Sequence, residues 1–212
     1  MRKQLEQQVG RRFARVATNA AVRWPALWRV FRPLMRAQFD RLAPRWDTMR
    51  ADAHLSSFEL ALEGVEGSPR LALDLGTGTG AAAFAVARRF PEAQVTGADL
   101  SEEMLAEARA KTPAELAGRV TFEQADAARL PYGDASFELV TLANMIPFFD
   151  ELARVLGRGG WALFSFSVGP ETPIWVPPER LQAELSHRGF SDFAEFQAGA
   201  GTALLARKKE PV

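Results

Sequence analysis

The sequence contains no cysteine, only two histidines and a single tyrosine. The lack of cysteine excludes a disulfide framework, a thiolate nucleophile and a zinc–thiolate site. The histidines, His54 and His187, are far apart in the chain, so we expect no metal site. No apolar run is long enough to cross a bilayer and no secretory leader is recognisable, which makes a cytoplasmic location the default expectation.

The net charge of zero hides an uneven distribution of charge along the 212 residues. Residues 1–50 hold twelve basic and three acidic side chains, whereas residues 51–212 hold fourteen basic and twenty-three acidic ones. Such a split indicates two parts with different surfaces. We therefore expect a basic, aromatic helical appendage or lid over residues 1–62 and a ligand-binding α/β core over residues 63–212.

The basic part has apolar residues at steps of three and four between residues 9 and 42, which is a helical period. Pro25 and Pro33 are expected to break or kink this pattern into two or three helices. One interpretation is an appendage packed on the core with solvated arginines. The alternatives are a lid over a ligand site and, through residues 1–46, peripheral contact with anionic lipid at the inner membrane surface. Nucleic-acid binding fits less well, because tryptophans at helical spacing indicate a buried face.

The most informative stretch of the sequence is one strand–turn–helix–strand unit. Leu71–Leu75 is a short apolar run, typical of a strand buried on both faces of a parallel sheet. Three glycines follow at once: Gly76, Gly78 and Gly80. An alanine-rich helix comes next, and a second strand ends at Asp99, nineteen residues after the last glycine, which is the spacing of one βαβ unit.

This unit predicts a ligand that contains adenosine. The glycines let backbone N–H groups approach a ligand closely, and Asp99 can accept two hydrogen bonds from a ribose diol. Gly76, Gly78 and Ala81 also satisfy a relaxed dinucleotide fingerprint. However, Asp74 stands two residues before the first glycine, and a carboxylate there is unfavourable beside a pyrophosphate and favourable beside a cationic ligand.

The pattern from Asp74 to Gly80, D-L-G-T-G-T-G, resembles motif I of the class I S-adenosylmethionine-dependent methyltransferases. Asp126-Ala127, the run Arg129–Glu138 and the segment Phe39–Asp47 are similar to other motifs of small-molecule methyltransferases, the ubiquinone and menaquinone C-methyltransferases among them. The resemblance implies a doubly wound, mostly parallel seven-stranded sheet, a Rossmann-like fold, with the helical appendage in front. It also implies S-adenosyl-L-methionine as cofactor and S-adenosyl-L-homocysteine as product.

The resemblance assigns roles to residues at the strand ends. Asp99 would bind the ribose and Asp126 the adenine amino group, while Asp74 and Asn144 would orient the methionine end of the cofactor. The expected cofactor contacts are Asp74, Gly76, Thr77, Gly78, Thr79, Gly80, Asp99, Leu100, Met104, Asp126, Ala127, Ala143 and Asn144. The expected substrate contacts are Trp46, which replaces the tyrosine usual in the family, Met145 and Trp175.

The rest of the chain continues the alternation of strands and helices. Strands are expected over residues 120–124, 139–142 and 161–166, and helices over residues 101–111 and 178–188. A closing hairpin is expected over residues 193–207, a feature typical of the family and unlike a nicotinamide-binding domain. The loop after the fourth strand is short, so one wall of the acceptor pocket is expected to come from the N-terminal helices.

The favoured function is methyl transfer to a small-molecule or lipid-like acceptor. A nicotinamide-dependent oxidoreductase is a rival, although Tyr132 has no partner lysine for a proton relay. The other rival is a non-catalytic cofactor-binding module that docks through its basic helices. No residue stands in a motif for a general base, so the catalytic residue is unknown, and the groups available for that role are His54, His187, Asp47 and Glu171.

Overall fold

The computed structural model describes residue 15, residue 18 and residues 27–49 and 55–209. The helix expected before residue 27, Pro25 and His54 lie outside the described residues. Within the described part of the chain, no helix combines the length and the apolar character needed to cross a membrane.

A seven-stranded sheet forms the centre of the molecule, in the order β3-β2-β1-β4-β5-β7-β6. The strands are β1 (Leu71–Leu75), β2 (Gln94–Asp99), β3 (Val120–Gln124), β4 (Phe137–Ala143), β5 (Leu156–Phe166), β6 (Phe190–Ala198) and β7 (Gly201–Lys208). The first five strands pair in parallel, and β7 pairs antiparallel with both β5 and β6. The predicted doubly wound, mostly parallel α/β sheet with a closing hairpin is confirmed.

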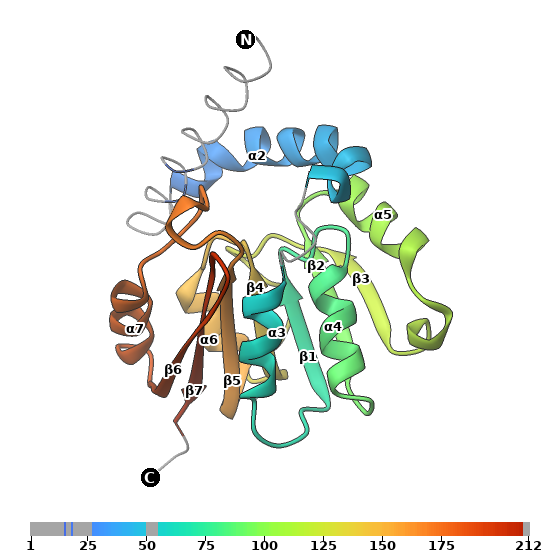
Figure 1. Cartoon of the computed structure of the whole chain (residues 1–212). Helices are drawn as coiled ribbons and strands as arrows, with labels where there is room; N and C mark the ends of the chain where they lie inside the picture. The colour runs from blue at the N-terminus through green and yellow to red at the C-terminus, as the bar shows by residue number, and fades with distance from the viewer. Residues whose placement is uncertain (1–14, 16–17, 19–26, 50–54, 210–212) are drawn as a thin grey trace.

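Helices cover both faces of this sheet (Figure 1). The helices of the described residues are α2 (Trp28–Leu42), α3 (Ser56–Glu63), α4 (Ala81–Arg89), α5 (Glu102–Lys111), α6 (Phe149–Val155) and α7 (Pro178–Ser186), with 3-10 turns η2 (Ala43–Arg45), η3 (Asp47–Met49), η4 (Ala114–Leu116) and η5 (Gly169–Glu171). Helices α3, α4 and α5 share one buried cluster with the sheet, to which Phe58 and Leu105 belong. Helices α6 and α7 contribute Leu152 and Leu185 to a second cluster, which also contains Trp28 from α2. Figure 1 shows α2 lying across the top of the sheet, above the ends of the strands, and not on either face.

The sequence marks the starts of α4 and α5 with suitable residues. Gly80 precedes α4 with a φ of 89°, and a Cβ there would come within 2.8 Å of the Phe84 ring, so only glycine fits. Ser101 precedes α5, and its hydroxyl accepts a hydrogen bond from the N–H of Met104 at 3.2 Å. This cap satisfies one N–H group of the first turn, which is a common role of serine at the start of a helix.

Two expectations need correction. The pattern does not break at Pro33, because α2 runs through this residue from Trp28 to Leu42. The side chain is exposed there, so water can satisfy the carbonyl that loses its backbone partner. Strand β5 begins at Leu156 and not at Trp161, because Leu156 already pairs with Phe137 of β4. The register shifts before the next pair, Leu139 with Trp161, and Gly159 has a φ of 74° within this irregular stretch.

Candidate functional site

The N–H groups of the glycine turn after β1 already donate hydrogen bonds to acceptors within the protein. The N–H groups of Gly76 and Thr77 both donate to the carbonyl of Ala98, at 2.8 and 3.1 Å. The N–H of Gly80 donates to the carbonyl of Thr77 at 2.9 Å. The N–H of Gly78 donates to Asp99 Oδ2 at 2.9 Å. A turn with these four donors engaged is poorly suited to cradle a phosphate, which is bound chiefly by unengaged N–H groups.

Asp99 stands at the end of β2, beside this turn. Its second oxygen, Oδ1, accepts from the N–H of Ser101 at 2.9 Å. Burial raises the pKa of Asp99, and the N–H donors of Ser101 and Gly78 only partly offset that effect. The nearby charge of Asp40 raises this pKa further. Since each carboxylate oxygen can accept two hydrogen bonds, Asp99 keeps an acceptor position on both oxygens for a ligand hydroxyl.

Asp74 is buried in the middle of the sheet, with a relative exposure of 1%. Its Oδ1 accepts from the hydroxyl of Thr141 at 2.8 Å, whereas Oδ2 is buried without a hydrogen bond of acceptable geometry. Burial raises the pKa of Asp74 to about 6, against the opposing effect of the hydroxyls of Thr77 and Thr141. The site therefore contains a buried acid with one acceptor oxygen that the described residues leave unsatisfied.

One cavity of about 70 Å³ lies over the ends of β1, β2 and β4. The predicted residues that line it are Trp46, Gly76, Gly78, Asp99, Leu100, Met104, Ala127, Ala143, Asn144 and Met145. Asp74, Thr77, Thr79 and Gly80 lie outside this lining, Asp126 lines two neighbouring cavities, and Trp175 stands next to the lining residue Ile174.

Residues from the N-terminal segment cover this cavity. Trp28, Met35 and Phe39 of α2 line it, and the Phe39 ring packs edge-to-face on Trp46 with centroids 5.6 Å apart. The indole nitrogen of Trp46 lies 3.4 Å from the point where a Cβ on Gly78 would stand. The N-terminal segment therefore forms one wall of this cavity, and the side chains that it contributes are Trp28, Met35, Phe39 and Trp46 instead of arginines.

Asp47 links the N-terminal segment to the glycine turn through a hydrogen bond with Thr79. Its Oδ1 accepts from the hydroxyl of Thr79 at 2.6 Å, and its Oδ2 pairs with Lys111 of α5 at 2.7 Å. Thr79 is buried by this contact, so its hydroxyl is aimed at η3 and not at the cavity. Of the other base candidates, His187 caps the C-terminus of α7 and Glu171 ends η5.

The end of β4 presents Asn144 and Met145. Asn144 has a φ of 54°, and its Oδ1 accepts from both the N–H and the hydroxyl of Ser167, at 2.9 and 3.1 Å. This pair of bonds leaves the amide nitrogen of Asn144 as a donor. Met145 folds over the glycine turn, with its sulfur 2.6 Å from the point where a Cβ on Gly76 would stand. A side chain on Gly76 would therefore collide with the end of β4.

Asp126 follows β3 and is engaged by α2. Its Oδ1 accepts from the indole N–H of Trp28 at 2.8 Å and from the N–H of Ala128 at 3.0 Å. Its Oδ2 accepts from Arg32 at 3.0 Å. The periodicity of residues 9–42 marked Trp28 as inward-facing, but no local signal connected it to an acid 98 residues away.

Known proteins are similar to the central part of the chain. Residues 72–160 match a family model described as a methyltransferase domain. The demethylmenaquinone methyltransferase of Deinococcus radiodurans is 37% identical over 138 residues, which are 59% of this chain and 57% of the relative. The corresponding enzyme of Thermus thermophilus is 40% identical over 138 residues, 58% of this chain and 60% of the relative. The chain thus spans little more than half the length of these curated relatives.

Solved structures share the fold at low sequence identity. The cyclase SpnF has a TM-score of 0.65 at 20% identity, and the match covers 82% of this chain and 95% of the SpnF chain. Phosphoethanolamine N-methyltransferase 2 of Haemonchus contortus, solved with S-adenosyl-L-methionine, has a TM-score of 0.57 at 20% identity and covers 72% of this chain and 52% of its own. The chain therefore has the Rossmann-like fold of these proteins, and its residues 72–160 are similar to a methyltransferase domain.

Proposed function

We propose that this chain transfers a methyl group from S-adenosyl-L-methionine to a small, lipid-like acceptor. This proposal rests on the hydrogen bonds that the N–H groups of the glycine turn already make to acceptors within the protein. A nicotinamide dinucleotide needs such groups for its pyrophosphate, and here Asp99 takes the N–H of Gly78. The buried Asp74 and the partly buried Asp99 beside the turn repel a phosphate and attract a cation.

The residues present fit this cofactor. S-adenosyl-L-methionine, when bound, supplies a methyl group activated by a positively charged sulfur. The negative charge of Asp74, buried next to the cavity, favours the positive charge of the methionine end. The amide nitrogen of Asn144 suits its carboxylate. The open acceptor positions of Asp99 suit the ribose hydroxyls. The protein's task is to orient the two reactants and to keep water from the cation.

Access to the site requires movement of the N-terminal segment. The cavity of about 70 Å³ is well below the roughly 300 Å³ that small-molecule sites usually offer. Its covering residues Trp28, Met35, Phe39 and Trp46 belong to residues 27–49. We propose that this stretch, within an appendage over residues 1–62, acts as a lid on a core over residues 63–212.

Calorimetry with S-adenosyl-L-homocysteine and with NADH tests the cofactor. We expect binding of the former and none of the latter. Asp99→Asn keeps the shape of the side chain and removes its charge, so it should weaken the binding of S-adenosyl-L-homocysteine. Binding of NADH alone would refute the proposal in favour of the oxidoreductase.

The acceptor is proposed from the relatives, whose names state demethylmenaquinone as their substrate. The mostly apolar lining of the cavity, which includes Met145, Ile146 and Ile174, supports an acceptor of this lipid-like class. The assay is transfer of an isotopically labelled methyl group from S-adenosyl-L-methionine to demethylmenaquinone in detergent, followed by mass spectrometry. Cofactor binding without transfer to any quinone acceptor would favour the non-catalytic docking module.

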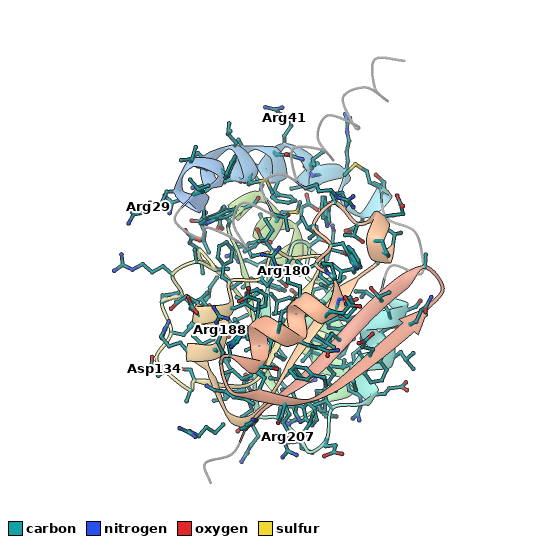
Figure 2. The ribbon with its side chains drawn as sticks, turned by 90° about the vertical axis from the view of Figure 1, so that its left-hand side faces the viewer. Arg29, Arg41, Asp134, Arg180, Arg188 and Arg207 are labelled. Atoms are coloured by element: carbon teal, nitrogen blue, oxygen red, sulfur yellow. The ribbon has the colours of Figure 1, made fainter. Side chains whose placement is uncertain are left out.

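The outer face of α2 supports peripheral contact with an anionic membrane. Leu27, Val30 and Leu34 lie three and four residues apart and are 40%, 65% and 58% exposed. Figure 2 shows Arg29 and Arg41 projecting from the same helix, away from the body of the molecule. An apolar face with flanking arginines is typical of a helix that lies in the lipid headgroup region.

Vesicle flotation tests this contact. Vesicles containing anionic lipid should carry the protein, and neutral vesicles should carry less of it. The paired change Val30→Asp and Leu34→Asp should abolish flotation, whereas Leu60→Asp on α3, which is 39% exposed, serves as the matched control. Equal flotation of all three proteins would refute membrane contact through α2.

A further inference from the structure

The carboxylate of Asp126 is surrounded by donors that belong to the protein. Trp28 and Arg32 reach it from α2, one turn apart, and Ala128 reaches it from its own loop. Trp28 is 6% exposed, and its ring packs edge-to-face on Phe148 with centroids 5.1 Å apart. A buried indole N–H needs an acceptor, so docking of α2 in this position depends on an oxygen of Asp126 that is turned toward Trp28.

Counting acceptor positions shows what Asp126 can still bind. A carboxylate has two oxygens and about four lone-pair positions. Trp28 and Ala128 occupy both positions on Oδ1, and Arg32 occupies one on Oδ2. One position on Oδ2 is left, so the carboxylate can accept one further N–H donor without losing a bond to α2.

A cleft of about 390 Å³ opens beside this oxygen. Arg32, Pro33 and Arg36 of α2 line one side of the cleft, and Leu100 and Ala125 from the ends of β2 and β3 line the other. This cleft shares Leu100 and Ala125 with the cavity over the glycine turn. It therefore offers a flat heteroaromatic ring a place between an apolar wall and a guanidinium group, next to an acceptor.

We propose that Trp28 and Arg32 are positioning residues, which hold Asp126 so that its remaining acceptor position selects the exocyclic amino group of adenine. This inference rests on the proposed function, because it concerns the nucleoside end of the same cofactor. The two α2 residues and the adenine amino group share one carboxylate. Docking of α2 and binding of the adenine ring therefore strengthen each other, and a purine with a 6-oxo group is rejected because it presents no amino donor there.

The test compares two ligands by calorimetry, S-adenosyl-L-homocysteine and its 6-oxo analogue S-inosyl-L-homocysteine. Trp28→Phe removes the N–H and keeps a ring, and Arg32→Gln removes the guanidinium. Each variant should weaken the binding of S-adenosyl-L-homocysteine by about three- to tenfold and should change the already weak binding of the 6-oxo analogue by much less. Arg29→Gln, on the same helix and without contact to Asp126, is the matched control and should bind both ligands like the wild type.

Three results would overturn the inference. Tighter binding of S-adenosyl-L-homocysteine by the variants would mean that α2 competes with adenine for Asp126. An equal loss of affinity for both ligands would mean that α2 covers the site without contributing to discrimination between the two bases. Unchanged affinity for S-adenosyl-L-homocysteine would mean that the contacts from α2 do not position Asp126 for adenine. If Trp28→Phe does not fold, Arg32→Gln decides alone, and a wild type that binds neither ligand would instead refute the proposed cofactor.

Discussion

Replacing Asp74 by asparagine should make the protein more stable and weaken its binding of the cofactor. Asp74 is 1% exposed, and burial raises its pKa from 3.8 to about 6 while the hydroxyls of Thr77 and Thr141 oppose the shift. Asparagine has almost the same shape, keeps an oxygen for the hydroxyl of Thr141 and carries no charge. The exchange therefore removes the cost of burying a charge and keeps the hydrogen bond.

The size and sign of this effect follow from the raised pKa. The folded state binds the proton more tightly than the unfolded state, so the wild type loses stability as the pH rises from about 4 to about 6. Two pKa units correspond to about 3 kcal/mol, which is the expected advantage of Asp74→Asn at pH 8. At pH 5 the advantage should be roughly half as large, because only part of the ionisation difference has developed.

Urea unfolding of the wild type and Asp74→Asn at pH 5 and pH 8 measures both values. Asp150→Asn is the matched control, because the side chain of Asp150 is 81% exposed and its exchange should give no comparable gain between the two pH values. An advantage of Asp74→Asn that is equal at both pH values, or a loss of stability at pH 8, would refute the reasoning. In calorimetry the same variant should bind S-adenosyl-L-methionine more weakly, since the buried negative charge is gone.

Three further changes test other parts of the site. Asp99→Ala should weaken the binding of S-adenosyl-L-homocysteine by about 1–3 kcal/mol in calorimetry, and unchanged affinity would place the ribose elsewhere. Ser101→Ala should lower the free energy of unfolding by about 1 kcal/mol, because the N–H of Met104 loses its cap; an unchanged urea midpoint would contradict this. Gly97→Ala should cost about 1–3 kcal/mol in the same assay, because its Cβ would come within 2.6 Å of the Phe122 ring, while Gly118→Ala, with no atom within 4 Å, should cost less.

The sheet could be predicted because its signals are local. Each signal depends on only a few neighbouring residues. Examples are the apolar run Leu71–Leu75, the glycines that follow it, and Ser101 at the start of α5, all of which lie where an element was expected. The closing hairpin also followed from two runs of strand residues around a glycine-rich turn. Such patterns predict which elements form and in what order, and the parallel βαβ rule then arranges them.

The contacts above the sheet could not be predicted in this way. The hydrogen bond from Trp28 to Asp126 joins residues 98 positions apart, and the pair of Asp47 with Lys111 joins residues 64 positions apart. Periodicity showed that Trp28 faces inward, but it carries no information on which acid receives the indole N–H. Pro33 misled the prediction of α2 because a proline on an exposed face loses only a bond that water can replace.

The fold by itself does not decide the reaction, since the same architecture is found in a cyclase and in an N-methyltransferase, each about as distant from this chain in sequence. The decision depends on polar groups that any ligand at the strand ends must satisfy. At this turn a ligand meets carboxylates and not N–H groups that lack an acceptor. The N–H of Gly78 is already bound by Asp99, and an oxygen of Asp74 lacks a hydrogen bond. A phosphate would have to displace Asp99 and would then meet Asp74, whereas a cation with ribose hydroxyls satisfies both acids. This difference in electrostatic complementarity favours a cationic sulfur cofactor over a dinucleotide at the same glycine turn.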